Sequence, residues 1–152
     1  MVLSDRQRGL KAHSDTIGPS HDKFLAIVRR KYRPRSATQP TGLPDIIVHC
    51  KDTIFFEIKP HKVIKNGSRK FIDSRKNRRY LSENQEKTIR RLLKEGEKNI
   101  FIVYYCKYQR KSGDRFVYRQ QKLNLENLKR FCFDSDDNRK FDVDELFWEK
   151  TS

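Results

Sequence analysis

Three charged residues lie on two neighbouring apolar segments, where a buried β-strand would normally exclude charge. Asp45 opens the segment of residues 43–48, and Glu57 and Lys59 close the segment of residues 54–59. Two carboxylates and an amine are the side chains needed to hold a divalent cation and to direct a water molecule at a phosphodiester. The two segments therefore predict a metal-dependent hydrolytic site.

Strand geometry decides whether these side chains can meet. Because side chains alternate between the two faces of a strand, Glu57 and Lys59 share one face. Asp45 begins a strand expected over residues 45–50, and its end of an antiparallel pair lies beside the end of the next strand, residues 53–59. A connecting loop of three or five residues, or a bulge, puts Asp45 and Glu57 on one face, whereas an even number separates them. We predict the odd number.

The expected cation is Mg²⁺, with Mn²⁺ able to substitute. Asp45, Glu57 and the backbone carbonyl of Ile58 are the predicted ligands, with waters and a phosphate oxygen completing the shell. Beside the cation, Lys59 is expected to have a lowered pKa and to orient or deprotonate the attacking water. The structural alternative is a simple salt bridge between Glu57 and Lys59 at a strand edge.

Charge favours a nucleic-acid partner. The chain has 152 residues, 35% hydrophobic and 36% charged, with a formal net charge of +15. A surface so strongly basic repels itself, so a polyanion is the natural partner, and no basic amphipathic helix or apolar run suggests a membrane. Three widely spaced cysteines and the lack of a signal-peptide segment lead us to expect a cytoplasmic, nucleoid-associated protein.

The pattern of apolar residues predicts an α/β fold, with a mixed central sheet flanked by helices. Residues 1–19 are expected to form an N-terminal arm and residues 20–152 a single domain, with a core of residues 20–106 and a C-terminal extension of residues 107–152. Pro60 is expected to end the strand that carries Glu57. The other expected elements are helices from Ser20 to about Tyr32, from Ser82 to Gly96, near 124–131 and at 142–150, and strands at 99–106 and 116–118.

The most basic segment, residues 61–80, follows the predicted site directly. Asn66-Gly67 suggests a hairpin with residues 63–64 and 71–72 as its arms. We expect this segment to track nucleic-acid phosphates, although a merely solvated charge run is the alternative. The predicted DNA contacts are Arg33, Arg35, Lys62, Lys65, Arg69, Lys70, Arg75, Lys76, Arg78 and Arg79.

Pro44-Asp45, the step to Glu57 and the run Glu57-Ile58-Lys59 resemble the PD-(D/E)XK nuclease superfamily. Residues 42–47 and 82–85 look most like its VRR-NUC and archaeal Holliday-junction-resolvase branches. The resemblance implies a restriction-endonuclease-like αβββαβ core and Mg²⁺-dependent cleavage of DNA, often by a homodimer, with branched DNA as the first expectation.

Two further residues are candidates with competing explanations. The resemblance implies a Glu on the first helix, and this sequence departs from that pattern because it has none there. Asp22 stands where such an acid could lie, although an acid in a first helical turn is also favoured by the helix dipole. The resemblance likewise implies a glutamine near the site, and Gln85 fits, but Ser82-x-x-Gln85 is also a capping box. We expect one side chain to be unable to fill both roles.

Two other functions remain open: a site-specific duplex DNA endonuclease of restriction, homing or transposon type, and a catalytically silent nucleic-acid-binding protein of the same fold. Residues 134–145 also resemble an EF-hand calcium loop, but Arg139 stands where the tight turn requires glycine. An acidic turn that caps the final helix is the better explanation of that stretch.

Overall fold

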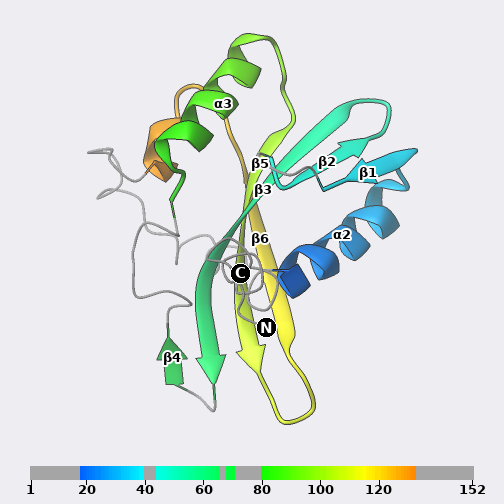
Figure 1. Cartoon of the computed structure of the whole chain (residues 1–152), viewed down its shortest axis with the longest axis vertical. Helices are drawn as coiled ribbons and strands as arrows, with labels where there is room; N and C mark the ends of the chain where they lie inside the picture. The colour runs from blue at the N-terminus through cyan, green and yellow to red at the C-terminus, as the bar shows by residue number, and fades with distance from the viewer. Residues whose placement is uncertain (1–17, 40–43, 66–67, 71–79, 133–152) are drawn as a thin grey trace, which may run out of the picture.

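The computed structural model describes residues 18–39, 44–65, 68–70 and 80–132. The described part is an α/β structure with one mixed, open sheet (Figure 1). Its elements are α2 (Gly18–Tyr32), β1 (Ser36–Thr38), β2 (Ile46–His49), β3 (Thr53–Lys65), β4 (Ser68–Lys70), α3 (Glu83–Lys94), β5 (Ile100–Gln109), β6 (Arg115–Lys122) and the 3-10 helix η2 (Leu128–Phe131). The strand order is β1-β2-β3-β5-β6, with β4 paired to β3.

The β2–β3 hairpin confirms the predicted odd loop. Strand β2 ends at His49 and β3 begins at Thr53, which leaves the three residues 50–52 between them. The strands are antiparallel, with Ile46 opposite Phe56 and Val48 opposite Ile54. Since Asp45 directly precedes this ladder, its register places Asp45 opposite Glu57.

The prediction that Pro60 ends its strand is wrong. Strand β3 continues through Pro60 to Lys65, and its parallel pairing with β5 shifts register between Pro60 and Lys62. His61 is the extra residue, so the strand passes Pro60 at a β-bulge, where a missing N–H is tolerated. The extension forms a hairpin with β4, in which Val63 pairs with Lys70.

The two helices cover opposite faces of the sheet, as Figure 1 shows. On one face α3 packs Ile89, Leu92 and Leu93 against a cluster that includes Phe55 and Tyr104. On the other face the apolar side of α2, with Phe24 and Val28, covers a cluster of alternate residues of β2, β3 and β5. Strand alternation therefore assigns each residue near the predicted site to one of two separate layers.

Local signals fixed the ends of α3. Ser82 caps its first turn, and Gly96 follows its end with a φ of 101°, a conformation that glycine adopts without strain. Strand β1 was not predicted; it is only three residues long and pairs with β2. The segment near 124–131 forms the 3-10 helix η2 rather than an α-helix.

Several predictions lie outside the described residues: residues 1–17 of the N-terminal arm, the hairpin arm at 71–72, the EF-hand-like stretch and the helix at 142–150. The last two residues of the predicted arm, 18 and 19, belong to α2 instead. Cys50, Cys106 and Cys132 are free thiols, the last two buried. Within the described ranges no helix has the length and apolarity needed to cross a membrane.

Candidate functional site

Asp45 and Glu57 meet at the end of the β2–β3 hairpin. The Asp45 carboxylate is held in place by the backbone of β3, because the N–H of Ile58 donates to Asp45 Oδ2 at 2.7 Å. The bond gives the Ile58 N–H an acceptor just beyond the point where the pairing of β2 with β3 ends. The predicted role of the Ile58 carbonyl as a metal ligand remains a prediction.

Glu57 is an almost fully buried acid, 2% exposed. Its Oε1 accepts a hydrogen bond of 3.4 Å from Gln85 Nε2, whereas its Oε2 is buried without a hydrogen-bond donor among the described residues. Burial, and then the charge of Asp45, raise the pKa of Glu57 well above its usual range. Two carboxylates accept hydrogen bonds and donate none, so a proton or a cation is needed between them.

Lys59 lies on the same face as Glu57 and is 9% exposed. Its Nζ donates a hydrogen bond of 2.7 Å to Gln85 Oε1. Burial lowers the pKa of Lys59, while the carboxylates of Glu57 and Asp45 partly oppose that shift. The direction of this pKa shift is the one predicted for Lys59, although its cause here is burial rather than a neighbouring cation. The contact with Gln85 fixes where the Lys59 amine lies.

Gln85 performs both of the roles that were expected to exclude each other, so that expectation is wrong. Its backbone N–H donates to Ser82 Oγ at 3.2 Å and its Oε1 accepts from the Ser82 N–H at 2.9 Å, which completes a capping box. The same Oε1 accepts from Lys59, and the amide nitrogen donates towards Glu57. An amide oxygen has two lone pairs, so one side chain serves the helix and the site together.

The residues present fit a hard divalent cation. Mg²⁺ is usually bound by one or two carboxylates, with waters and substrate phosphates completing its shell. Asp45 and Glu57 supply two carboxylates, and the buried Glu57 Oε2 lacks the partner that a cation would provide. Among the described residues no group of three or more His, Cys, Asp and Glu side chains is suited to a metal, so the protein's share would be this pair.

The structure does not bring Asp22 to this pair. Asp22 is exposed on α2, which covers the opposite face of the sheet, and its Oδ1 accepts a hydrogen bond of 3.4 Å from Gln39. The position of the acid expected on the first helix is therefore not next to Glu57 in this chain. Whether a helix lies on the same face as a strand residue cannot be read from their spacing in sequence.

The predicted DNA contacts lie in more than one region. Arg33 and Arg35 are exposed between α2 and β1, whereas Lys62 and Lys65 lie on the extension of β3 beyond the bulge. The backbone of Arg69 and Lys70 lies in β4, beside that extension. The remaining predicted contacts, Arg75, Lys76, Arg78 and Arg79, fall outside the described residues.

Arg119 was not predicted as a site residue, but the register of the sheet aligns it with Lys59 across neighbouring strands. Lys59 pairs with Tyr104 across β3 and β5, and Tyr104 pairs with Arg119 across β5 and β6. Paired residues share a face, so Arg119 stands two strands from Lys59, about 10 Å away. Its Nη1 donates to the Tyr118 carbonyl at 3.0 Å, while its buried Nε has no acceptor among the described residues. Only the register of β6 reveals this cation.

Comparisons of the chain with protein-family models, with curated proteins and with solved structures gave no match.

Proposed function

We propose that the protein is a metal-dependent endonuclease that hydrolyses DNA phosphodiester bonds, with a core of the restriction-endonuclease-like type. The observation that carries this proposal is the set of contacts that joins Glu57, Lys59 and Gln85 beside Asp45. A simple salt bridge at a strand edge would be exposed, whereas Glu57 and Lys59 are buried and both form hydrogen bonds with Gln85 of α3. Strongly perturbed pKa values in one cluster of this kind are typical of functional sites.

Each residue has a defined part in the proposed reaction. Asp45 and Glu57 would hold Mg²⁺, which supplies Lewis-acid activation of the phosphodiester when it is bound. Lys59 is positioned by Gln85 and has a lowered pKa, so its amine orients the attacking water and can accept its proton. Gln85 also holds Glu57, so it keeps the acid and the amine at a fixed separation.

The proposed substrate is DNA, with branched or otherwise distorted DNA first and a specific duplex sequence second. The net charge of +15 supports a polyanionic substrate. The hairpin of β3 and β4 extends from the same strand that carries Glu57 and Lys59, and it bears basic residues along the chain beyond the site (Figure 1). This continuity would align a phosphate backbone with the site.

Cleavage of labelled junction, flap and linear DNA, with Mg²⁺ and with EDTA, tests the proposal. Lys59→Met removes the amine and retains the length of the side chain, so we expect it to abolish cleavage. Lys51→Met is the matched control, since Lys51 is an exposed lysine in the turn of the same hairpin. Tight binding without cleavage in either Mg²⁺ or Mn²⁺ would show instead a nucleic-acid-binding protein without catalysis.

Symmetric cleavage of a junction requires two sites, so we also propose that the protein acts as a homodimer. The sheet is open, with β1 and β6 at its edges in the described part of the chain. Sedimentation of the protein with and without junction DNA measures this. A monomer in the complex, with one strand cut per binding event, would contradict the dimer and leave the chemistry untouched.

A further inference from the structure

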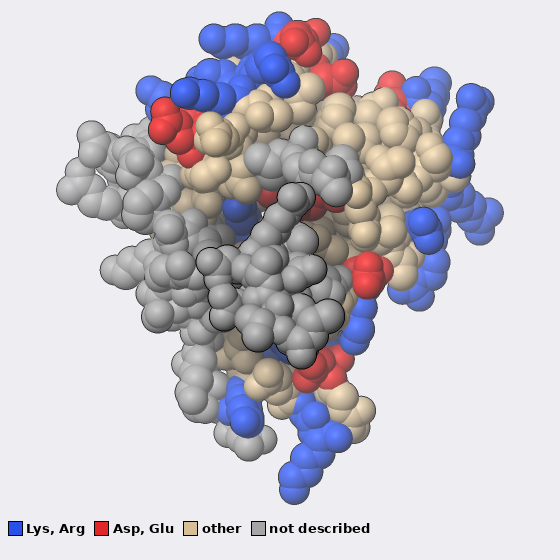
Figure 2. All heavy atoms as spheres, viewed as in Figure 1, with Lys and Arg blue, Asp and Glu red and all other residues tan. Residues whose placement is uncertain are grey.

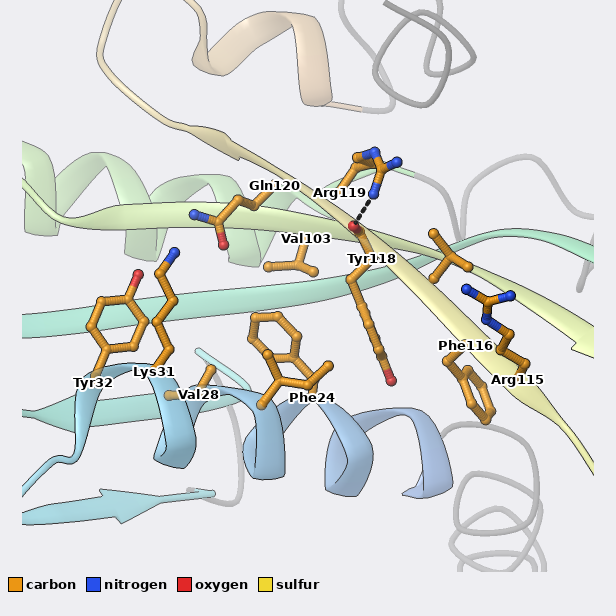
Figure 3. A pocket seen from close by; sticks show the side chains of 12 residues that line it. Phe24, Val28, Lys31, Tyr32, Val103, Arg115, Phe116, Tyr118, Arg119 and Gln120 are labelled. Atoms are coloured by element: carbon orange, nitrogen blue, oxygen red, sulfur yellow. Dashed lines mark hydrogen bonds between the residues drawn. The ribbon is translucent and has the colours of Figure 1, made fainter. Parts of the chain in front are cut away.

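A groove lies between α2 and β6, on the face of the sheet opposite the candidate site (Figure 3). Its volume of about 520 Å³ falls within the range of about 300–1,000 Å³ typical of ligand sites. The floor is apolar, formed by Phe24, Val28 and Val103. Aromatic rings from α2 and β6 stand along it, with Tyr32 towards one end and Phe116 towards the other.

The groove is basic at both ends. Lys31 lies beside Tyr32 at one end of the groove, with its Nζ 5.3 Å from that ring's centroid (Figure 3). Lys23 Nζ is 5.0 Å from the centroid of the Phe116 ring. None of the residues that line the groove is Asp or Glu. Cations at two separated places suit a chain of phosphates better than a single anionic group.

Three aromatic rings of the groove are partly exposed. Tyr32, Phe116 and Tyr118 are each half-buried, and the planes of Phe116 and Tyr118 lie within 18° of each other. The Gln120 amide lies across from Lys31 and can form hydrogen bonds with the edge of a base (Figure 3). Aromatic rings combined with a basic groove are the means by which proteins bind single-stranded nucleic acids without reading their sequence.

We propose that this groove binds a single-stranded segment of nucleic acid, separately from the candidate cleavage site. Its bases stack on Tyr32 and Phe116, and its phosphates lie against Lys31 and Lys23. The chain would then hold two parts of a branched substrate on opposite faces of one sheet. The binding does not require that the protein cleave DNA.

Fluorescence anisotropy with a labelled oligothymidylate tests the charged ends. Lys31→Glu with Lys23→Glu should weaken binding at least about tenfold. The control is Lys94→Glu with Lys98→Glu, which makes the same change in net charge at exposed lysines beside α3. Equal weakening by both pairs would mean that only net charge matters and would overturn the proposal.

Stacking is tested by Phe116→Leu and by an oligomer of abasic nucleotides. Phe116→Leu should weaken oligothymidylate by about tenfold and leave the abasic chain within about twofold. Cross-linking with 5-iodouracil oligomers should label the peptides that contain Tyr32 or Phe116. Unchanged binding by both groove variants, or a change in oligomeric state instead of binding, would contradict the proposal. Cleavage of DNA that persists in the groove variants would leave the proposed nuclease function intact. Binding of oligothymidylate that persists in Lys59→Met would show that the groove and the candidate cleavage site act separately.

Discussion

At the scale of single residues, the free-energy cost of burying charge in the candidate site falls mainly on Glu57. A carboxylate that is 2% exposed, with one oxygen lacking a donor in the described structure, is less stable charged than in water. Lys59 and Gln85 offset only part of that cost, since the pKa of Glu57 remains raised. Buried groups with strongly shifted pKa values are found mainly at functional sites. The function proposed for Glu57 here is to bind a metal ion.

Glu57→Gln is expected to stabilise the metal-free protein at neutral pH, by on the order of 1 kcal/mol. A raised folded pKa means that wild type has its full stability below the unfolded pKa and loses stability as pH rises through the folded pKa. Glutamine has no proton to lose, so its advantage should be absent near pH 4 and grow as the pH rises. Urea unfolding across this range measures the difference. A variant that is less stable at every pH would show that the carboxylate is not strained.

Mg²⁺ and a proton should compete for Glu57. Millimolar MgCl₂ is therefore expected to raise the melting temperature of wild type, and to raise it more at about pH 8 than at about pH 6. Glu57→Gln should lose most of this stabilisation because glutamine is neutral. Thermal unfolding monitored by circular dichroism, with EDTA as the reference, provides the readout. An equal rise in wild type and in the variant would place any bound Mg²⁺ elsewhere.

Arg33 is a second residue under strain. Its φ of 45° is in the left-handed region, which costs an L-residue about 1–2 kcal/mol, and its N–H donates to the Arg29 carbonyl at the end of α2. Glycine adopts this conformation freely, so Arg33→Gly is expected to stabilise the fold by about 0.5–1 kcal/mol and to weaken DNA binding. Arg33→Ala should weaken binding equally without the gain in stability. Normal DNA binding by both variants would leave the arginine without a function.

At the scale of elements, α3 and the site depend on one side chain. Gln85 closes the capping box with Ser82 and also holds Lys59 and Glu57, so the start of the helix and the positions of the acid and the amine are coupled. Distortion at either place is transmitted through this amide. The helix therefore positions the reactive groups as well as covering the sheet.

Substitutions at Ser82 and Gln85 should separate these roles. Ser82→Ala removes the side-chain cap and is expected to cost about 1 kcal/mol of stability, with cleavage reduced only slightly. Gln85→Ala should cost a similar amount and also reduce cleavage at least about tenfold, because Lys59 and Glu57 lose their common partner. Cleavage rates at saturating DNA, with stability from urea unfolding, compare the two. Equal loss of activity in both would mean that Gln85 acts through the helix alone.

Local features of the sequence were sufficient for some elements and not for others. The odd loop between β2 and β3 and the limits of α3 follow from alternation and from capping residues, which lie close together in the chain. The passage of β3 through Pro60 depends on the bulge against β5, a partner some forty-five residues away. The same holds for Arg119, whose face is set by the register of β6, and for Asp22, whose helix covers the other face.

At the scale of the whole molecule, positive charge is spread rather than confined to the site. Figure 2 shows Lys and Arg side chains over α3 and along the edge near β1 and β2. The extension of β3 lies in one region, whereas Arg33 and Arg35 follow directly on Lys31 and Tyr32 at one end of the α2–β6 groove. Such a distribution suits a substrate that contacts several sides of the protein, as a branched molecule would.

Salt dependence of junction binding should report how many phosphates the protein contacts. The logarithm of the association constant is expected to fall linearly with the logarithm of salt concentration, between about 50 and 200 mM, with a slope of about −0.9 for each duplex phosphate contacted. Arg35→Gln removes one exposed cation at the start of β1, so it should make the slope less steep by about one and weaken all DNA sequences alike. Lys94→Gln, at the end of α3, is the matched control for net charge. If both variants change the slope equally, the protein attracts DNA through its overall charge and has no fixed path for the backbone along β1.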